Sequence, residues 1–182
     1  MALPYGVILL TITLGMVLIF KTDIIKDTSV TPTGKPYSLA RTQLMCWTLI
    51  IFCCFIYIWG FSKDINKVEL GKTTLILLGI STGIVMVGKS IDDSDKQELE
   101  KGNIKSLIQD SPSGGFLWDI LTDRKGISIH RLQNVLFTVA LMIGFIVSVY
   151  YSSKMPEFDE TLLILSGVSS AGYLGVKLNE NK

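Results

Sequence analysis

The sequence is poor in charged residues, and the shortage falls in separate stretches of the chain. Only 18% of the 182 residues are charged, while 48% are hydrophobic; a soluble domain usually carries about 25% charged residues. Disordered chains show the opposite balance, with many charges and few apolar residues. The composition therefore excludes a disordered chain and an ordinary soluble enzyme, and it favours a multi-pass membrane protein.

Cysteine and histidine are also scarce. The three cysteines, Cys46, Cys53 and Cys54, lie in one apolar stretch, and an odd number in such a place excludes a disulfide scaffold. They lack the spacing and the histidine partners of a metal site, because His130 is the only histidine. The polar segments contain no nucleophile–base pair and no nucleotide-binding loop. We therefore expect no catalytic residues, no metal, no cofactor and no enzymatic activity.

Five segments contain no Asp, Glu, Lys, Arg or His. Two of them have 16 residues, about 24 Å of helix, and need their flanks to cross a hydrocarbon core of about 30 Å. None has the polar face of a soluble helix or the alternation of a membrane strand. The sequence thus predicts an all-α, polytopic membrane protein with five transmembrane helices. The segments are Leu3–Phe20, Thr42–Ser62, Thr73–Gly88, Leu132–Ser153 and Thr161–Val176.

The basic residues predict the orientation of these helices. Thirteen of the 17 lysines and arginines fall in segments 21–41, 89–131 and 177–182, which share one side of the membrane. Loops rich in Lys and Arg stay in the cytoplasm, so we expect the N-terminus outside and the C-terminus in the cytoplasm. No basic residue precedes the first segment and no cleavage pattern follows it, so we expect a retained helix there rather than a signal peptide.

Part of the sequence is duplicated. A lead-in with the pattern K-x-x-S-x-x-R-x-Q begins at Lys35 and again 90 residues later at Lys125. Thr73–Ser81 then matches Thr161–Ser169 at an offset of 88. Each unit is a lead-in, a helix, an outer turn and a second helix, which makes the repeat parallel. The expected parts are the first helix with its linker (1–34), the first hairpin (35–90), a cytoplasmic loop (91–124) and the second hairpin (125–182).

The repeated basic residues are the candidate ligand-binding residues. In each lead-in a serine precedes the helix as an N-cap, and an arginine lies in the first turn at the inner headgroup level. A simple membrane anchor needs only some basic residue there, whereas a bound phosphate favours the planar fork of arginine beside a helix N-terminus. Both interpretations stay open, and the second predicts a basic rim that binds an anionic lipid or a nucleotide-like ligand. The rim residues are Lys35, Arg41, Lys89, Lys125, Arg131 and Lys177.

Small residues recur four apart in the third and fifth segments. Such stripes let helix backbones approach closely and offer an assembly surface. The serines beside them either bond to backbone carbonyls or line a water-filled path. The residues expected in helix packing or in a pore are Gly79, Ser81, Gly83, Gly167, Ser169, Ala171 and Gly175.

The longest polar segment separates the two units. It opens with five acidic residues between Asp92 and Glu100, which we expect to form a solvated surface, followed by a short helix. Further on, Phe116–Leu121 is mostly apolar. We expect that piece to lie against lipid headgroups or to cover the bundle.

The lead-ins and the L-x-L-x-G-[IV]-S pattern of the third and fifth segments resemble a group of small bacterial multi-pass inner-membrane proteins. The resemblance runs from Lys35 to the C-terminus and brings no residue roles with it. At the level of fold, the chain also resembles the membrane effectors of bacterial antiphage systems such as Hailong, which are paired with a nucleotidyltransferase. These resemblances imply a bacterial inner-membrane location, and the second suggests a nucleotide-type ligand.

Two functions fit these features. The first is an oligomeric inner-membrane pore or channel, gated from the cytoplasm by an anionic ligand and suited to membrane disruption in antiphage defence. The second is a non-conducting anchor or scaffold that recruits a soluble partner through its cytoplasmic loop. The expected partners are membrane lipids, further copies of the chain and an anionic nucleotide, but no duplex nucleic acid.

Overall fold

The computed structural model describes residues 2–27, 34–62, 70–103, 107, 112–123 and 126–178. Helices account for 78% of these residues, in agreement with the predicted all-α class. Besides the helices, the described residues contain one two-stranded antiparallel hairpin and one isolated bridge. In chain order the elements are α1 (Ala2–Lys21), α2 (Leu39–Ser62), α3 (Lys72–Glu100), α4 (Phe116–Leu121), β1 (Thr122–Asp123), β2 (Gly126–Ile127), α5 (Ile129–Ser152) and α6 (Glu160–Lys177).

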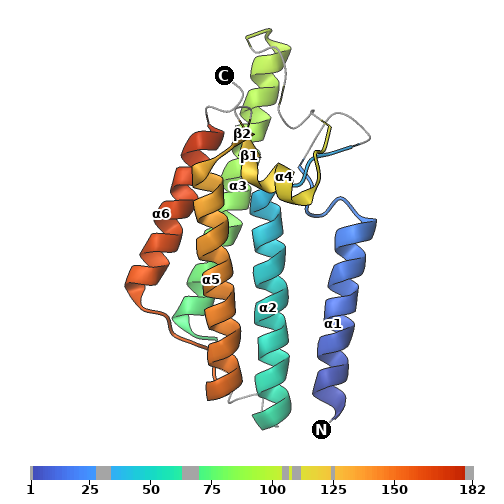
Figure 1. Ribbon diagram of the computed structural model, residues 1–182, viewed down its shortest axis with the longest axis vertical. Coiled ribbons are helices and arrows are strands. Elements are labelled where there is room, and N and C mark those ends of the chain that lie inside the picture. The colour runs from blue at the N-terminus through green and yellow to red at the C-terminus, as the bar shows by residue number, and fades with distance from the viewer. Residues whose placement is uncertain are drawn as a thin grey trace.

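Helices α2, α3, α5 and α6 form a bundle (Figure 1). Helix α2 packs against α3, and α5 packs against α6, so each predicted hairpin is a contact pair. The hairpins lie side by side, with α2 beside α5 and α3 beside α6. The short helix α4 and the β1–β2 hairpin lie at the end where α2 and α5 begin (Figure 1). We call this the α4 end of the bundle.

Helix α1 packs mainly against α2 and stands at the edge of the bundle (Figure 1). It is apolar on all sides, and only 6% of its Pro4–Lys21 stretch is buried. Between α1, α2 and α5 lies an apolar groove of about 290 Å³, lined by residues such as Ile12, Leu49 and Ile146. An apolar helix exposed on most of its surface is stable in lipid and not in water.

Four helices are long and apolar enough to cross a membrane: α1, α2, α3 and α5. Helix α6, the fifth predicted span, is not among them. Its buried face carries polar residues, including Ser166, Ser169 and Lys177, while its exposed face carries Ile164 and Val168. Its three serines and Lys177 lower the mean hydropathy but point into the bundle, so composition alone underrates the apolar surface that α6 presents.

Helix α3 is longer than the sequence suggested. The third span was expected to end at Gly88, with a solvated acidic segment beyond it, but the helix continues unbroken to Glu100. Asp92 and Asp95 are buried, with 4% and 5% of their surface exposed. The first part of the predicted loop 91–124 is thus helix, and the expectation of a solvated acidic surface is wrong for these two aspartates.

The bundle contains two apolar clusters. The proximal core, near the α4 end, and the distal core, toward the other end, share no residue. The proximal core consists of Leu39, Ala40, Ile84, Ile120 and Tyr173. The distal core consists of Trp47, Ile51, Cys54, Ile58, Leu77, Leu141, Phe145, Val149 and Leu163.

The two lead-ins have matching backbone hydrogen bonds. The Ser38 amide donates to the carbonyl of Ile25 at 2.8 Å, and the Ser128 amide donates to the carbonyl of Leu121 at 2.9 Å. Ser128 occupies the N-cap position of α5, but its side chain makes no capping hydrogen bond. Each serine is preceded by an antiparallel pair, Tyr37 with Lys26 and Ile127 with Thr122.

Candidate functional site

Three of the six predicted rim residues meet in one small hollow at the α4 end of the bundle. Arg41 comes from the first turn of α2, Lys89 from α3 and Lys177 from the end of α6. Asp27 and Asp92 also line the hollow, so three cations face two carboxylates. Its volume is about 10 Å³, which is room for roughly one water molecule. The remaining lining residues are Ser38, Ala40, Val85 and Gly88.

A buried ion pair between α6 and α3 forms the floor of this hollow. The Lys177 Nζ lies 3.0 Å from Oδ1 and 3.2 Å from Oδ2 of Asp92, and both residues are 4% exposed. Asp27 adds a longer contact at 4.0 Å. Burial alone would lower the pKa of Lys177, but Tyr173, Asp27 and Asp92 raise it above its ordinary value. The ammonium therefore stays charged, and it joins the end of α6 to α3.

Arg131 does not share this hollow. It is 7% exposed, and its guanidinium lies over the ring of Tyr173 with Cζ 5.4 Å from the centroid. Its Nη1 donates a long hydrogen bond of 3.5 Å to the carbonyl of Asp119. The two arginines occupy equal positions in the repeat, but Arg131 is held by an aromatic ring whereas Arg41 is half-buried beside charged groups.

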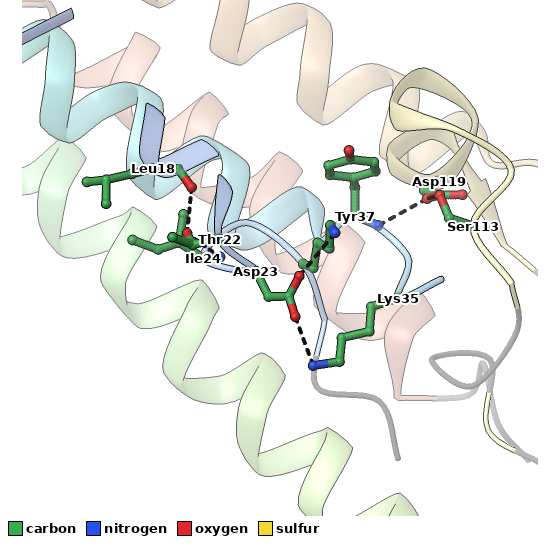
Figure 2. A network of polar contacts seen from close by, with 9 residues as sticks. Leu18, Thr22, Asp23, Ile24, Lys35, Tyr37, Ser113 and Asp119 are labelled. Carbon is green, nitrogen blue, oxygen red and sulfur yellow. Dashed lines mark hydrogen bonds and ion pairs between the residues drawn. The ribbon is translucent and has the colours of Figure 1, made fainter. Parts of the chain in front are cut away.

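Lys35 lies elsewhere, and Lys125 falls outside the described residues. The Lys35 ammonium pairs with Asp23 at 3.0 Å on an exposed surface (Figure 2). Lys26 contacts the same carboxylate at 3.0 Å. Hydrogen bonds from Lys35 and Lys26 hold the pKa of Asp23 below its usual range. Lys35 therefore fastens the segment after α1 and takes no part in the hollow.

Asp119 of α4 joins the inter-unit segment to the first lead-in. Its carboxylate accepts hydrogen bonds from the Tyr37 amide at 3.0 Å, the Ser113 hydroxyl at 2.5 Å and the Gly114 amide at 2.8 Å. Figure 2 shows the first two of these bonds converging on Asp119. Sequence reasoning missed this role because the contact with Tyr37 spans 82 positions and leaves no local pattern.

The predicted small-residue stripes do not pack within the chain. A Cβ atom added to Gly79, Gly83, Gly167 or Gly175 would meet no atom within 4 Å, and Ala171 is exposed. The assembly surface that these stripes predict would therefore lie between copies of the chain.

Tight contacts at glycine occur instead between α1 and α2. A Cβ at Gly15 would lie 2.8 Å from the Leu49 side chain, and one at Gly60 would collide with Pro4. No four-residue spacing marks these two glycines, so the sequence pattern did not reveal them.

The predicted pore serines, Ser81 and Ser169, are buried, with 4% and 5% of their surface exposed. They belong to a set of polar side chains from all four bundle helices, which we call the polar layer. On α2 the layer lies between Ala40 of the proximal core and Trp47 of the distal core, and α3 and α6 show the same order. The polar layer consists of Gln43, Ser81, Asn134, Thr138, Ser166, Ser169 and Ser170.

Among the described residues, a direct hydrogen bond crosses the polar layer between α2 and α5. The Gln43 amide donates to the Thr138 hydroxyl at 2.8 Å. Other buried polar atoms, among them Asn134 Nδ2 and Ser169 Oγ, have no hydrogen-bond partner among the described residues. The interior of the bundle is thus polar between two apolar clusters, while the outside is apolar.

No protein family, curated protein or solved structure matches the chain. The function is therefore argued from the membrane-compatible helices, the hollow and the polar layer.

Proposed function

We propose that this protein is a subunit of an oligomeric pore or channel in the bacterial inner membrane, gated from the cytoplasm by an anionic ligand. The observation that supports it is the hollow in which Arg41 and Lys89 flank the buried Lys177–Asp92 ion pair. Arginine and lysine together bind phosphate groups by charge and by directed hydrogen bonds. A nucleotide-type ligand, as expected for an antiphage effector, supplies such a group.

The ion pair links ligand binding to helix movement. An anion that enters beside Arg41 competes with Asp92 for the ammonium of Lys177. The hollow has room for roughly one water molecule, so in this proposal a bound phosphate group widens it by moving α6 away from α3. A ligand that binds the shifted state better than the closed state moves the population toward it.

In this proposal the α4 end faces the cytoplasm and α6 is the fifth membrane helix. The exposed apolar side chains of α6, such as Ile164 and Val168, suit contact with lipid. The open glycine faces of α3 and α6 then serve contacts between copies of the chain, where small residues allow close approach. Identical contacts repeated around an axis close into a ring.

The topology can be tested with single cysteines in a cysteine-free variant. Lys154, in the turn before α6, and Lys101, after α3, are both exposed. We expect a membrane-impermeant thiol reagent added to intact cells to label position 154 and not position 101. Labelling at position 101 alone, or at both positions, contradicts the proposed orientation.

Gating is tested with the purified protein in dye-filled liposomes. We expect ATP or pyrophosphate to release dye from liposomes with the wild-type protein and to release less from those with Arg41→Lys. Lys101→Gln, an exposed lysine away from the hollow, is the matched control and should behave as wild type. A strictly monomeric protein in native mass spectrometry, or liposomes that stay tight with both anions, would overturn the proposal.

A second candidate function rests on α4. Its Phe116, Leu117 and Trp118 are 42%, 68% and 56% exposed, and Asp119 fixes the helix against the first lead-in. A rigid apolar surface of this kind suits a non-conducting scaffold that holds a soluble partner or the membrane surface. Two results together favour this function over the pore. Liposomes with the protein stay tight, and the wild-type protein retains a soluble partner that Leu117→Ser does not retain.

A further inference from the structure

The polar layer is the feature that the proposed gating does not use. Its seven side chains are all at least nine-tenths buried, and they come from the four helices of the bundle. A buried polar group that makes no hydrogen bond is costly, so such groups are normally paired with protein or with ordered water.

Two side chains of the layer have unused hydrogen-bonding atoms. Asn134 is 1% exposed and its Nδ2 has no partner in the described ranges; Ser169 is 5% exposed and the same holds for its Oγ. The two residues lie on the buried faces of α5 and α6, which pack against each other. Beside the layer, the buried Oγ1 of Thr42 also has no hydrogen-bond partner among the described residues. Thr42 directly precedes Gln43, whose amide is paired. The Oγ1 of Thr74 likewise has no partner among the described residues, but Thr74 lies in the first turn of α3 and is not part of the layer.

The chemistry of the layer determines what it binds. Its side chains offer hydroxyl and amide groups, and none of the seven carries a charge. Hard cations are usually held by carboxylates in addition to neutral oxygens, so the layer suits a neutral ligand that both donates and accepts. Water meets this requirement, and a buried water typically makes about three hydrogen bonds.

We propose that the polar layer is a water-binding site inside each subunit, in which ordered water bridges Asn134 and Ser169. The distal core closes the site on one side, where the rings of Trp47 and Phe145 meet edge to face with centroids 5.9 Å apart. On the other side the proximal core, which includes Tyr173, lies between the layer and the hollow. The proposed water is therefore enclosed between the two apolar cores.

Radiolytic hydroxyl labelling read by mass spectrometry tests this inference on the full chain in nanodiscs. Radicals formed from bound water oxidise the side chains beside it, even where those side chains are closed to bulk solvent. Tyr173, 2% exposed, is one turn from Ser169, whereas Trp47, 3% exposed, belongs to the distal core. We expect Tyr173 to be oxidised several-fold faster than Trp47, although their exposure is nearly equal.

Variants of the layer should remove the difference. In Asn134→Leu, and in the milder Ser169→Ala, the bridging groups are lost and Tyr173 oxidation should fall toward the Trp47 rate. Thr48→Val, on the exposed face of α2, is the matched control and should leave the rates unchanged. Equal rates for Tyr173 and Trp47 in the wild type, or Tyr173 oxidation that persists in Ser169→Ala, overturn the inference. The liposome result does not affect this test.

Discussion

Lys177 and Asp92 join α6 to α3 through an ion pair in which both residues are 4% exposed. Two charges taken out of water are stable only while each has its partner. The pair therefore holds the end of α6 against α3, and a change at either residue must affect both helices.

The first prediction concerns this pair. Lys177→Met leaves the carboxylate of Asp92 buried without its ammonium, and we expect a loss of about 3–5 kcal/mol in the free energy of unfolding. The double variant Lys177→Met/Asp92→Leu should recover most of it, because an apolar pair needs no compensation. Unfolding by SDS titration measures both values. Lys35→Met removes an exposed ion pair; it is the control and should change the free energy of unfolding little. A double variant no more stable than Lys177→Met contradicts the prediction.

The pH dependence of the same pair follows from the raised pKa of Lys177. A lysine whose pKa is higher in the folded state contributes stability below its unfolded pKa and loses it only as the pH rises through the folded value. The stability difference between wild type and Lys177→Met should thus be constant around neutral pH and shrink only in strongly alkaline solution. If this stability difference already decreases as the pH rises from neutral to mildly alkaline, the pKa of Lys177 in the folded state is not raised and the prediction is wrong.

The second prediction separates the two arginines. Arg131→Lys keeps the charge but loses the planar group that lies over Tyr173, so we expect a loss of about 0.5–2 kcal/mol in stability. Arg41→Lys should leave stability unchanged and reduce only the response to anions. Heat resistance in detergent and dye release, measured on both variants, check the contrast. Equal effects on both measurements mean that the arginines have the same role.

The third prediction concerns glycine. Gly60→Leu must push α1 away from α2 because Pro4 already fills the space, and overpacking of this kind costs about 1–3 kcal/mol. Gly79→Leu meets no atom of its own chain, so the monomer should keep its stability. A smaller oligomer in Gly79→Leu, measured by native mass spectrometry, places that face between subunits; an unchanged oligomer means that it faces lipid.

The fourth prediction concerns the hydrogen bond between Gln43 and Thr138. Hydrogen bonds between membrane helices contribute about 0.6 kcal/mol on average, so a double-mutant cycle with Gln43→Leu and Thr138→Val should give a coupling of about that size. Gln133, the repeat counterpart of Gln43, is exposed. Gln133→Leu should therefore have no measurable effect on unfolding, and a coupling near zero for the first pair rejects the bond as a stabilising contact.

The helices and the grouping of Arg41, Lys89 and Lys177 could be predicted because they leave local signals. Charge-free segments predict apolar helices, and the repeat places each lysine at the same helix position. The role of Asp92 could not be predicted, because an aspartate in an acidic run resembles solvated surface until its lysine partner, 85 positions away, is known.

Two further features show the same limit of local patterns. Small residues four apart indicate that close packing is allowed, but not whether the neighbour is another helix or lipid, and Gly79 and Gly167 meet no atom of their own chain. Helix α6 has a low mean hydropathy because it contains three serines and a charged residue at each end, although the serines face inward. Which face of a helix is buried depends on tertiary contacts that a mean over the sequence does not contain.

The unbroken course of α3 has a mechanical consequence. Twelve residues, Lys89–Glu100, extend the helix past Gly88, and this corresponds to about 18 Å of rigid rod. Lys177 holds this helix at Asp92 and Asp95 is buried as well, so the part beyond Asp95 acts as a short lever arm and a small tilt of the bundle becomes a larger displacement at Glu100. A soluble protein that touches only this tip would sense the state of the membrane helices without entering the membrane.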